Sequence, residues 1–351
     1  MPVPRLVRRL LFTAVVVLVA LLVFAATPVL LLAAALASPF LPGRLRALRI
    51  LVFALVYLAL EALLIVVLGV LWLAAGFGRR IAGARMQRTH YRLLAWFLRV
   101  LMGTARHAFD VRVEVHGSSP PPLPRVPLIV LARHAGPGDS FLLVHQLLDA
   151  ERRRPRIVLK DALQWDPLID ITLNRLPAHF VSSARPTADA TASIADLASG
   201  MGPDDALVIF PEGGNFTERR RRRSIAKLDE LGRHAEARRA RELRHLLAPR
   251  SGGVLAALTG CPSADVVLVA HTGLEALSTV VDLWRGIPLD DDIDIRMWHI
   301  PAADVPSDEA GRIKWLGDSW RRMDDWIDSE RAGLRATSRR PAGGAPARRG
   351  I

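Results

Sequence analysis

Two long apolar stretches open the chain. Residues 10–37 contain no charged side chain, and residues 50–77 contain only one, Glu61. Each stretch exceeds the roughly 20 residues that an α-helix needs to cross the hydrocarbon core of a bilayer. The pattern predicts two transmembrane helices, at about 10–37 and 50–77, which form a membrane hairpin within residues 1–80.

Arginines flank these stretches and indicate their orientation. Three precede the first stretch and three lie between the two, whereas the segment after the second stretch carries five: Arg79, Arg80, Arg85, Arg88 and Arg92. Because positively charged loops stay on the cytoplasmic side, we expect both ends of the hairpin there. A signal peptide also begins with arginines, but its apolar part is about half as long as residues 10–37. Glu61 is either a functional acid inside the membrane or a side chain neutralised by an arginine or a helix partner.

Residues 81–108 mix arginines with large apolar side chains at near-helical spacing. This pattern is typical of a helix that lies in the membrane interface, and we expect that arrangement. A helix packed on a soluble domain shows the same pattern, so the alternative stays open.

Beyond residue 108 the pattern changes to short apolar runs separated by helix-like stretches. The runs are 111–117, 127–132, 156–160, 178–183, 206–210 and 265–270. Their alternation predicts an α/β domain over residues 109–333. The strongly charged residues 218–247 are expected to form a helical insertion, compatible with one long exposed helix from 218 to 245. Residues 334–351 predict a disordered tail.

Composition adds a cationic bias. The formal net charge is +13, and only three of the basic side chains are lysines, Lys160, Lys227 and Lys314. Such a charge suits an anionic membrane face or substrates that carry phosphate. The single cysteine, Cys261, excludes an intrachain disulfide and a multi-cysteine metal site, and no pair of histidines has zinc-ligand spacing with a third ligand. We expect no bound metal.

Two loops that follow apolar runs carry the candidate chemistry. The sequence RHAGPGDS at 133–140 places His134 and Asp139 after the run at 127–132, a position where α/β proteins commonly hold their sites. A neutral histidine can take a proton from a hydroxyl, and a carboxylate can hold the required tautomer. The alternative is structural, with Asp139 capping the next helix.

The second loop is FPEGGNFT at 210–217. Its glycines permit a tight turn whose backbone amides can receive a phosphate or an oxyanion. Glu212 has the wrong charge for a phosphate ligand, so we expect it to orient an arginine or the loop itself. A plain strand-to-helix turn is the alternative.

Together the two loops resemble those of the glycerolipid acyltransferase family. His134 and Asp139 match its HxxxxD motif, and residues 210–213 match its FPEG motif. Residues 160–163, KDAL, look like its KxEL segment, and residues 245–258 resemble its downstream L-x-P-x-x-G stretch. The resemblance covers about residues 110–300 in the family's order. It implies a glycerolipid-acyltransferase-like α/β domain preceded by the two-helix membrane hairpin.

The chain also departs from the family's pattern. Where the family usually reads FPEGTR, Gly214 and Asn215 remove a hydroxyl and a guanidinium. Ser183 stands where the family has an arginine, and Arg185 follows two residues later. We expect phosphate contact from Arg185 first and from Arg250 second; without Arg185 the head group of the acceptor is open. The other expected substrate-binding residues are Lys160, Glu212, Gly213 and Gly214.

The resemblance implies a single displacement without an acyl-enzyme. His134 would deprotonate a hydroxyl of lysophosphatidate or a related lysophospholipid, which attacks an acyl thioester, and Asp139 would stabilise the imidazolium. The expected donor is acyl-CoA or acyl carrier protein, and we expect no cofactor. The chain would then be an integral membrane enzyme of phospholipid biosynthesis whose catalytic domain faces the cytoplasm. The alternatives are acylation of another lysophospholipid or a lipid-linked polyol, and an inactive membrane lipid-binding protein.

Other polar residues compete weakly for these roles. Ser140 lies outside any nucleophile elbow, G-x-S-x-G, and is interpreted as helix N-terminal structure. His271 ends an apolar run and is a further candidate to line the pocket. The arginines at 219–223 suit lipid head groups, coenzyme A phosphates or an acidic carrier protein, or else form a solvated helix face. No aromatic residue interrupts the basic segment 219–250, so we expect no nucleic acid as a partner.

Overall fold

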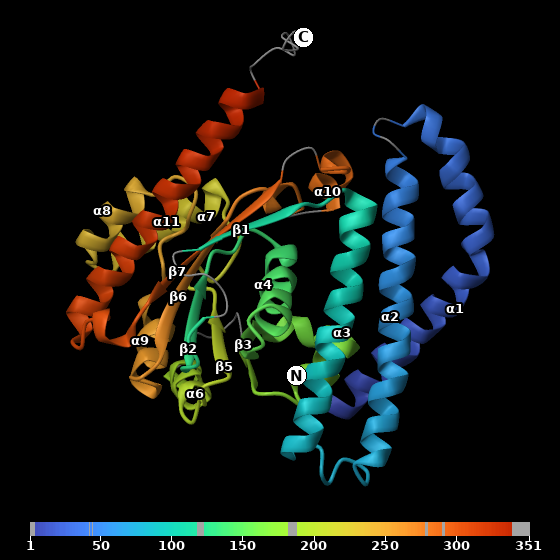
Figure 1. Ribbon diagram of the computed structural model, residues 1–351, viewed down its shortest axis with the longest axis horizontal. Coiled ribbons are helices and arrows are strands. Elements are labelled where there is room, and N and C mark those ends of the chain that lie inside the picture. The colour runs from blue at the N-terminus through green and yellow to red at the C-terminus, as the bar shows by residue number, and fades with distance from the viewer. Residues whose placement is uncertain are drawn as a thin grey trace, which may run out of the picture.

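A computed structural model of the chain describes residues 4–41, 43, 45–117, 123–181, 188–277, 280–289 and 292–338. It contains a seven-stranded sheet with helices on both faces, and further helices are stacked outward from one of these faces (Figure 1). This mixed α/β architecture confirms the fold class expected from the alternating runs.

The sheet has the strand order β1-β7-β6-β2-β5-β3-β4. The strands are β1 (Val113–Gly117), β2 (Leu128–Ala132), β3 (Arg154–Lys160), β4 (Ala178–Val181), β5 (Asp205–Ile209), β6 (Asp265–His271) and β7 (Ile293–Ile300). All neighbours are parallel except β6 and β7. The central strands β2 and β5 are buried at every position, because helices cover both faces of the sheet.

β7 is absent from the runs that the sequence predicts. Its residues, IDIRMWHI, mix charged with apolar side chains, and only part of the strand is buried. The strand nevertheless pairs antiparallel with β6 and parallel with β1, so it joins β1 to the rest of the sheet.

Helices α6 (Ala188–Ala198), α9 (Ser251–Gly260) and α11 (Glu309–Ser338) cover one face of the sheet. Ile194, Val254 and Trp320 from these helices pack on Leu131 and Leu268 of the strands. The helix α4 (Pro137–Asp149) covers the other face through Leu142, Leu143 and Leu147. The sheet therefore separates two apolar cores, and the candidate loops lie between them at the strand ends.

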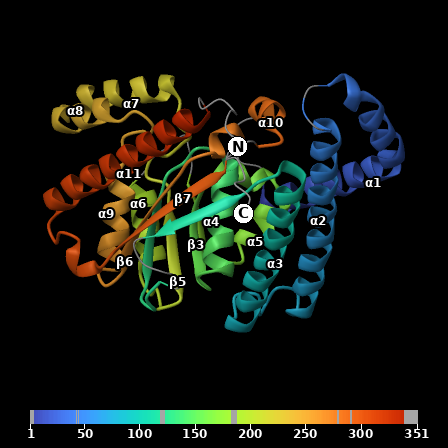
Figure 2. The ribbon, with the colours of Figure 1, turned by 45° about the horizontal axis from the view of Figure 1, so that its top comes forward.

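Three further helices continue the stack beyond α4. They are α3 (Ala84–Phe109), α2 (Arg46–Ala74) and α1 (Arg5–Ala37), in that order outward (Figure 2). α3 contacts both α2 and α4, and Phe97, Leu98 and Leu101 are buried between them. The sequence pattern favours a helix in the membrane interface over residues 81–108 and leaves a helix packed on the domain as the alternative. The structure shows the packed helix.

The charged segment after residue 217 forms two helices instead of one. α7 (Glu218–Glu230) and α8 (His234–Glu242) pack against each other and are joined by a short turn. Gly232 in this turn has a φ of 71°, a left-handed conformation that ends the first helix. The expectation of one long helix is wrong because this glycine reverses the chain.

The remaining helices are short. They are α5 (Pro167–Leu173), α10 (Val280–Gly286) and the 3₁₀ turns η1 (Ser38–Phe40), η2 (Asp161–Trp165), η3 (Leu274–Leu277) and η4 (Ala302–Asp304). α11 extends to Ser338, so residues 334–338 are helical where a disordered tail was expected, and residues 339–351 lie outside the described part of the chain. The other domain boundaries remain predictions.

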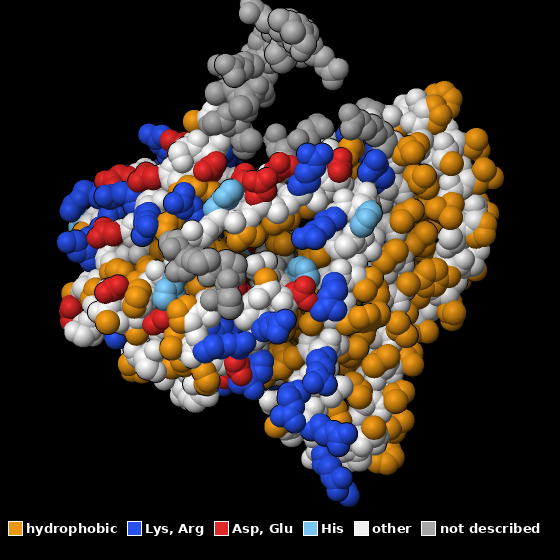
Figure 3. Space-filling view, viewed as in Figure 1, with side chains coloured by type: hydrophobic (Ala, Val, Ile, Leu, Met, Phe, Trp, Pro, Cys, Tyr) orange, Lys and Arg blue, Asp and Glu red, His pale blue; other side chains and the backbone are white. Residues whose placement is uncertain are grey.

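The helices α1 and α2 are long and apolar enough to cross a bilayer. Many of their large hydrophobic side chains are exposed, and Figure 3 shows them gathered over one side of the molecule. Glu61 is buried within α2, on the side that carries the buried Leu64 and Leu68. Its functional role remains a prediction.

Both helices are tied to the α/β domain by arginines. Near the start of α1, Arg8 and Arg9 contact the buried carboxylate of Asp170 in α5, at 3.1 and 2.8 Å. At the start of α2, Arg46 Nε donates to the carbonyl of Ile287 at 2.6 Å, and Arg49 donates to a carbonyl at the end of α3. The turn between α1 and α2 is therefore held on the α/β domain.

Candidate active site

The two candidate loops follow adjacent parallel strands. β2 ends at Ala132 and is followed by His134, whereas β5 ends at Ile209 and is followed by residues 210–215. Because β2 and β5 pair in parallel, their carboxyl ends meet at one edge of the sheet. The ring of Phe210 lies against that of His134, with 4.8 Å between the ring centroids.

His134 and Asp139 form a pair within the first loop. His134 Nδ1 lies 3.1 and 3.2 Å from the two carboxylate oxygens of Asp139. This contact fixes the ring so that Nδ1 faces the carboxylate and Nε2 lies on the opposite edge. An imidazole held in this way can accept a proton at Nε2 while the carboxylate stabilises the resulting charge.

Several donors hold the Asp139 carboxylate in place. The backbone N–H groups of Ala135 and Gly136 donate to Oδ2, and the Ser140 hydroxyl donates to Oδ1. Burial alone would raise the pKa of Asp139, but the hydrogen bond to His134 and the nearby His271 outweigh it and hold the pKa below its usual range. Asp139 is therefore ionised at neutral pH.

His271 lies behind the pair and not among the residues that line the cavity described below. Its Nε2 is 3.8 Å from Asp139 Oδ2, and the side chain is almost fully buried. The expectation that His271 lines the pocket is wrong, because this side chain is buried beside Asp139 at the end of β6 and is not part of the cavity lining. Its carbonyl accepts a hydrogen bond from Arg133, the residue before His134.

Arg133 is a site residue that the sequence does not reveal. Its side chain is only 2% exposed and contacts Glu275 at 2.6 Å, and Glu275 also contacts Arg331 of α11 at 2.7 Å. Burial would raise the pKa of Glu275, but the two arginines lower it to about 2. This chain of charges ties the His134 loop to the long C-terminal helix.

Glu212 joins the two loops. Its buried carboxylate accepts a hydrogen bond from the backbone N–H of His134 at 2.9 Å and another from that of Leu247 at 2.8 Å. Burial raises its pKa to about 7, although both hydrogen bonds oppose the shift. Glu212 orients the His134 loop, and its carboxylate is occupied by backbone donors, so its substrate-binding role remains a prediction.

His134 opens onto a large cavity of about 780 Å³. Most of its lining is apolar and comes from α2, α3, α4, α5 and the strands β3 and β5, including Leu64, Leu94, Phe97, Val144 and Leu173. The volume lies within the range of small-molecule sites. A long apolar chain fits this lining, with its reactive end beside His134.

Polar residues of the second loop stand at the same cavity. Lys160, Gly213, Asn215 and Arg250 line it together with His134. Gly213 has a φ of 68°, and the guanidinium of Arg250 occupies the space that a Cβ at this position would need. The expected residues Lys160, Gly213 and Arg250 are thus brought together, and Gly214 lies beside them in the same loop.

Arg185 and Ser183 lie outside the described residues, so their expected contribution remains a prediction. Three ligand-type side chains lie together on neighbouring strands: Glu114 and His116 of β1, which are exposed, and Asp294 of β7, which is half-buried. β1 is the outermost strand on one side of the sheet and β7 is its neighbour, whereas the loops of the candidate site follow the central strands β2 and β5.

Comparison with known proteins shows which proteins this part of the chain resembles. Residues 112–262 match the family model described as Acyltransferase. This segment holds His134, Asp139 and Glu212, so the part of the chain that carries both motifs is similar to acyltransferases.

Two individual proteins are also similar. An uncharacterized acyltransferase of Schizosaccharomyces pombe is 23% identical over 189 residues, which cover 49% of this chain and 51% of the relative. The chain thus spans about half the length of this curated relative. The crystal structure of the 1-acyl-sn-glycerophosphate acyltransferase PlsC from Thermotoga maritima aligns with 77% of this chain and 97% of its own, with a TM-score of 0.42 and 14% identity.

Proposed function

We propose that the protein transfers a fatty acyl group from an acyl thioester to a hydroxyl of lysophosphatidate or a related lysophospholipid. The observation that carries the proposal is the His134–Asp139 pair at one end of a largely apolar cavity of about 780 Å³. The acyltransferase family match supports the reaction type. The acceptor and the donor, acyl-CoA or acyl carrier protein, are parts of the proposal.

The proposed chemistry is a direct displacement. His134 Nε2 takes the proton of the acceptor hydroxyl as its oxygen attacks the thioester carbonyl carbon. A C–O bond forms, the C–S bond breaks, and the imidazolium returns the proton to the leaving thiolate. Asp139, held ionised by its donors, stabilises the imidazolium in between. Both substrates supply all the atoms of the product, so we propose no cofactor.

The cavity lining supports a lipid substrate. Its apolar side chains come partly from α2, the helix whose outer neighbour α1 exposes the most hydrophobic surface. We propose that the acyl chain lies among α2, α3 and α5 and leaves the thioester carbon beside His134. A chain entering from a membrane would reach this space between the helices without crossing water.

The contacts of α1 and α2 bear on membrane attachment. Arg46 binds backbone carbonyls of the α/β domain at one end of α2, and Arg175 donates to the Leu68 carbonyl near the other end. A turn held on the domain cannot also lie across a bilayer from it. We therefore propose that the apolar outer surface of α1 and α2 inserts into the membrane from the cytoplasmic side (Figure 3).

The proposal is tested with purified protein in nanodiscs. Labelled acyl-CoA and acyl carrier thioesters are offered with a panel of lysophospholipids and a lipid-linked polyol, and the products are read by mass spectrometry. An acylated lysophospholipid supports the proposal and names the acceptor. Acylation of the polyol alone supports the alternative acceptor, and no product from folded, lipid-binding protein supports the inactive lipid-binding alternative.

A further inference from the structure

Three cationic side chains from separate parts of the fold come together near the loop 210–215. Lys160 is the last residue of β3, Arg250 precedes α9, and Arg220 lies in the first turn of α7. Lys160 and Arg250 line the cavity beside His134, and Arg220 Nη1 donates to the carbonyl of Asn215, a further lining residue. The three cations therefore surround the loop 210–215.

Two glycines give the guanidinium groups access to this loop. A Cβ at Gly213 would lie 2.8 Å from Cζ of Arg250, and a Cβ at Gly214 would lie 3.2 Å from Nη1 of Arg220. A side chain at either position would press against the arginine that now occupies the space. The loop is thus shaped to carry two guanidinium groups on its backbone.

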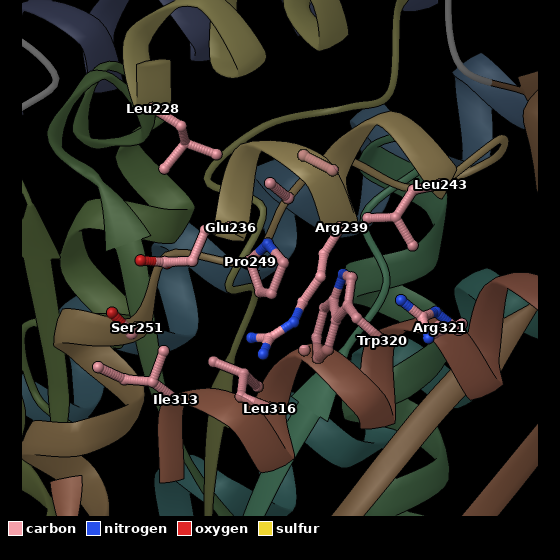
Figure 4. Close-up of a pocket in the computed structure, with 13 residues that line it drawn as sticks. Leu228, Glu236, Arg239, Leu243, Pro249, Ser251, Ile313, Leu316, Trp320 and Arg321 are labelled. Atoms are coloured by element: carbon pink, nitrogen blue, oxygen red, sulfur yellow. The ribbon is translucent and has the colours of Figure 1, made fainter. Parts of the chain in front are cut away.

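The helix that carries Arg220 is firmly attached. Thr217 caps α7 by accepting a hydrogen bond from the Arg220 backbone N–H at 3.2 Å, and Arg221 donates to the carbonyls of Leu243 and Arg241. Figure 4 shows the other end of α7, where Leu228 borders a pocket of about 30 Å³ that Trp320 of α11 also lines. α7 is therefore held against α8, and Arg220 projects from a supported helix.

Carboxylates of the described residues do not neutralise the charges of this cluster. Within the described part of the chain, none of the three cations forms an ion pair with a carboxylate, whereas their neighbours Arg221 and Arg222 both contact Glu218. Burial and the charges of Arg220 and Arg250 lower the pKa of Lys160, because both guanidinium groups lie near its amine. Repulsion of this kind is relieved when an anion binds between the cations.

We propose that Arg220 is a specificity-determining residue that, with Arg250 and Lys160, binds a phosphate group of a substrate beside the loop 210–215. The inference rests on the proposed acyltransferase function and adds a residue from the charged helix α7 to the site. The phosphate belongs either to the head group of the acceptor or to coenzyme A. Asn215 provides no charge, and Arg220 supplies the guanidinium at this loop instead.

The test compares Arg220→Ala with Arg222→Ala, an exposed arginine of the same helix that contacts Glu218. Both variants are checked for the wild-type unfolding temperature. Lysophosphatidate and an uncharged monoacylglycerol serve as acceptors, each with acyl-CoA and with acyl-pantetheine, which lacks the nucleotide phosphates. We expect Arg220→Ala to raise the KM for either lysophosphatidate or acyl-CoA, whichever carries the bound phosphate, about tenfold or more. The KM for the phosphate-free counterpart, monoacylglycerol or acyl-pantetheine, should stay unchanged.

The pattern of the effect identifies the source of the phosphate. A change confined to lysophosphatidate assigns the head group, and a change confined to acyl-CoA assigns the donor. Adding Asn215→Arg to Arg220→Ala returns a guanidinium to the loop and should restore much of the affinity. An equal loss in Arg222→Ala, or an unchanged KM for every phosphate-bearing substrate, overturns the inference.

A binding measurement keeps the inference separate from the proposed reaction. Lysophosphatidate and coenzyme A are titrated into wild type and Arg220→Ala in nanodiscs without a second substrate. About tenfold weaker binding of one of them by the variant supports Arg220 even if the wild type turns over no substrate, which would contradict only the proposed function. If wild type and Arg220→Ala bind lysophosphatidate equally well and also bind coenzyme A equally well, the inference about Arg220 is overturned.

Discussion

Glutamine in place of Glu212 should weaken the link between the two loops of the site. Glu212 is 3% exposed and accepts backbone hydrogen bonds from His134 at 2.9 Å and from Leu247 at 2.8 Å. A glutamine amide has one acceptor oxygen, so its NH₂ group must face one of these N–H donors. A buried donor left unpaired costs about 1–3 kcal/mol, so we expect Glu212→Gln to lose about 2 kcal/mol of unfolding free energy.

Thermal unfolding in one detergent measures this loss, which corresponds to a Tm lower by several degrees. The matched control is Glu218→Gln, because that carboxylate is 51% exposed and its ion-pair partners among the described residues are Arg221 and Arg222 of its own helix. We expect the control to change stability by less than about 0.5 kcal/mol. Acyl transfer should also slow in Glu212→Gln, since the backbone of His134 loses a partner. An unchanged Tm in Glu212→Gln would refute the assigned role of the carboxylate.

The remaining predictions concern pH, chain length and membrane attachment. Burial raises the pKa of Glu212 to about 7, so the folded protein holds the Glu212 proton more tightly than the unfolded chain does. The stability gained from this proton is complete below the ordinary glutamate pKa of about 4.3 and is lost as the pH rises through 7. The Tm gap between wild type and Glu212→Gln should therefore narrow from about pH 5.5 to about pH 8.5, and a widening gap would contradict this sign. Leu94→Trp places a larger side chain in the cavity lining and should shift the preferred acyl donor to shorter chains, measured by competition between thioesters; an unchanged preference would remove the acyl chain from this space. Cysteines introduced at Leu45, in the α1–α2 turn, and at Leu231, in the α/β domain, should react with an impermeant maleimide from the same side of oriented vesicles, because Cys261 is buried and silent. Reaction from opposite sides would show that the hairpin crosses the bilayer.

Local sequence patterns anticipated the elements whose burial is continuous. The runs that form β2, β5 and β6 are buried on both faces, so they consist almost entirely of apolar residues. Such runs can be recognised as strands without knowing which strands lie beside them. The loops after β2 and β5 were brought together by their resemblance to the HxxxxD and FPEG motifs, and the structure shows that the two strands are parallel neighbours. β7 escaped notice because it is only partly buried, and its place follows from pairing with β1 and β6.

Contacts between distant segments could not be read from the chain. Arg133 looks like an ordinary loop arginine until Glu275 and Arg331 come together around it. Hydropathy identifies α1 and α2 as membrane-seeking, but it does not reveal that Arg46 binds a carbonyl 241 residues away. Arg220 belongs to a run of five arginines, and only the fold shows that it reaches Asn215. Residue type alone does not distinguish it from its neighbours.

The central claim is that His134 acts as the base in acyl transfer. The most direct measurement is the rate of product formation from a saturating acyl thioester and lysophospholipid by wild type, His134→Ala and His145→Ala, the last being a histidine on α4 outside the cavity lining. We predict that His134→Ala lowers kcat by about 10²-fold to 10⁴-fold with an unchanged Tm, and that His145→Ala retains activity. A His134→Ala variant that is folded and transfers acyl groups at the wild-type rate would contradict the account.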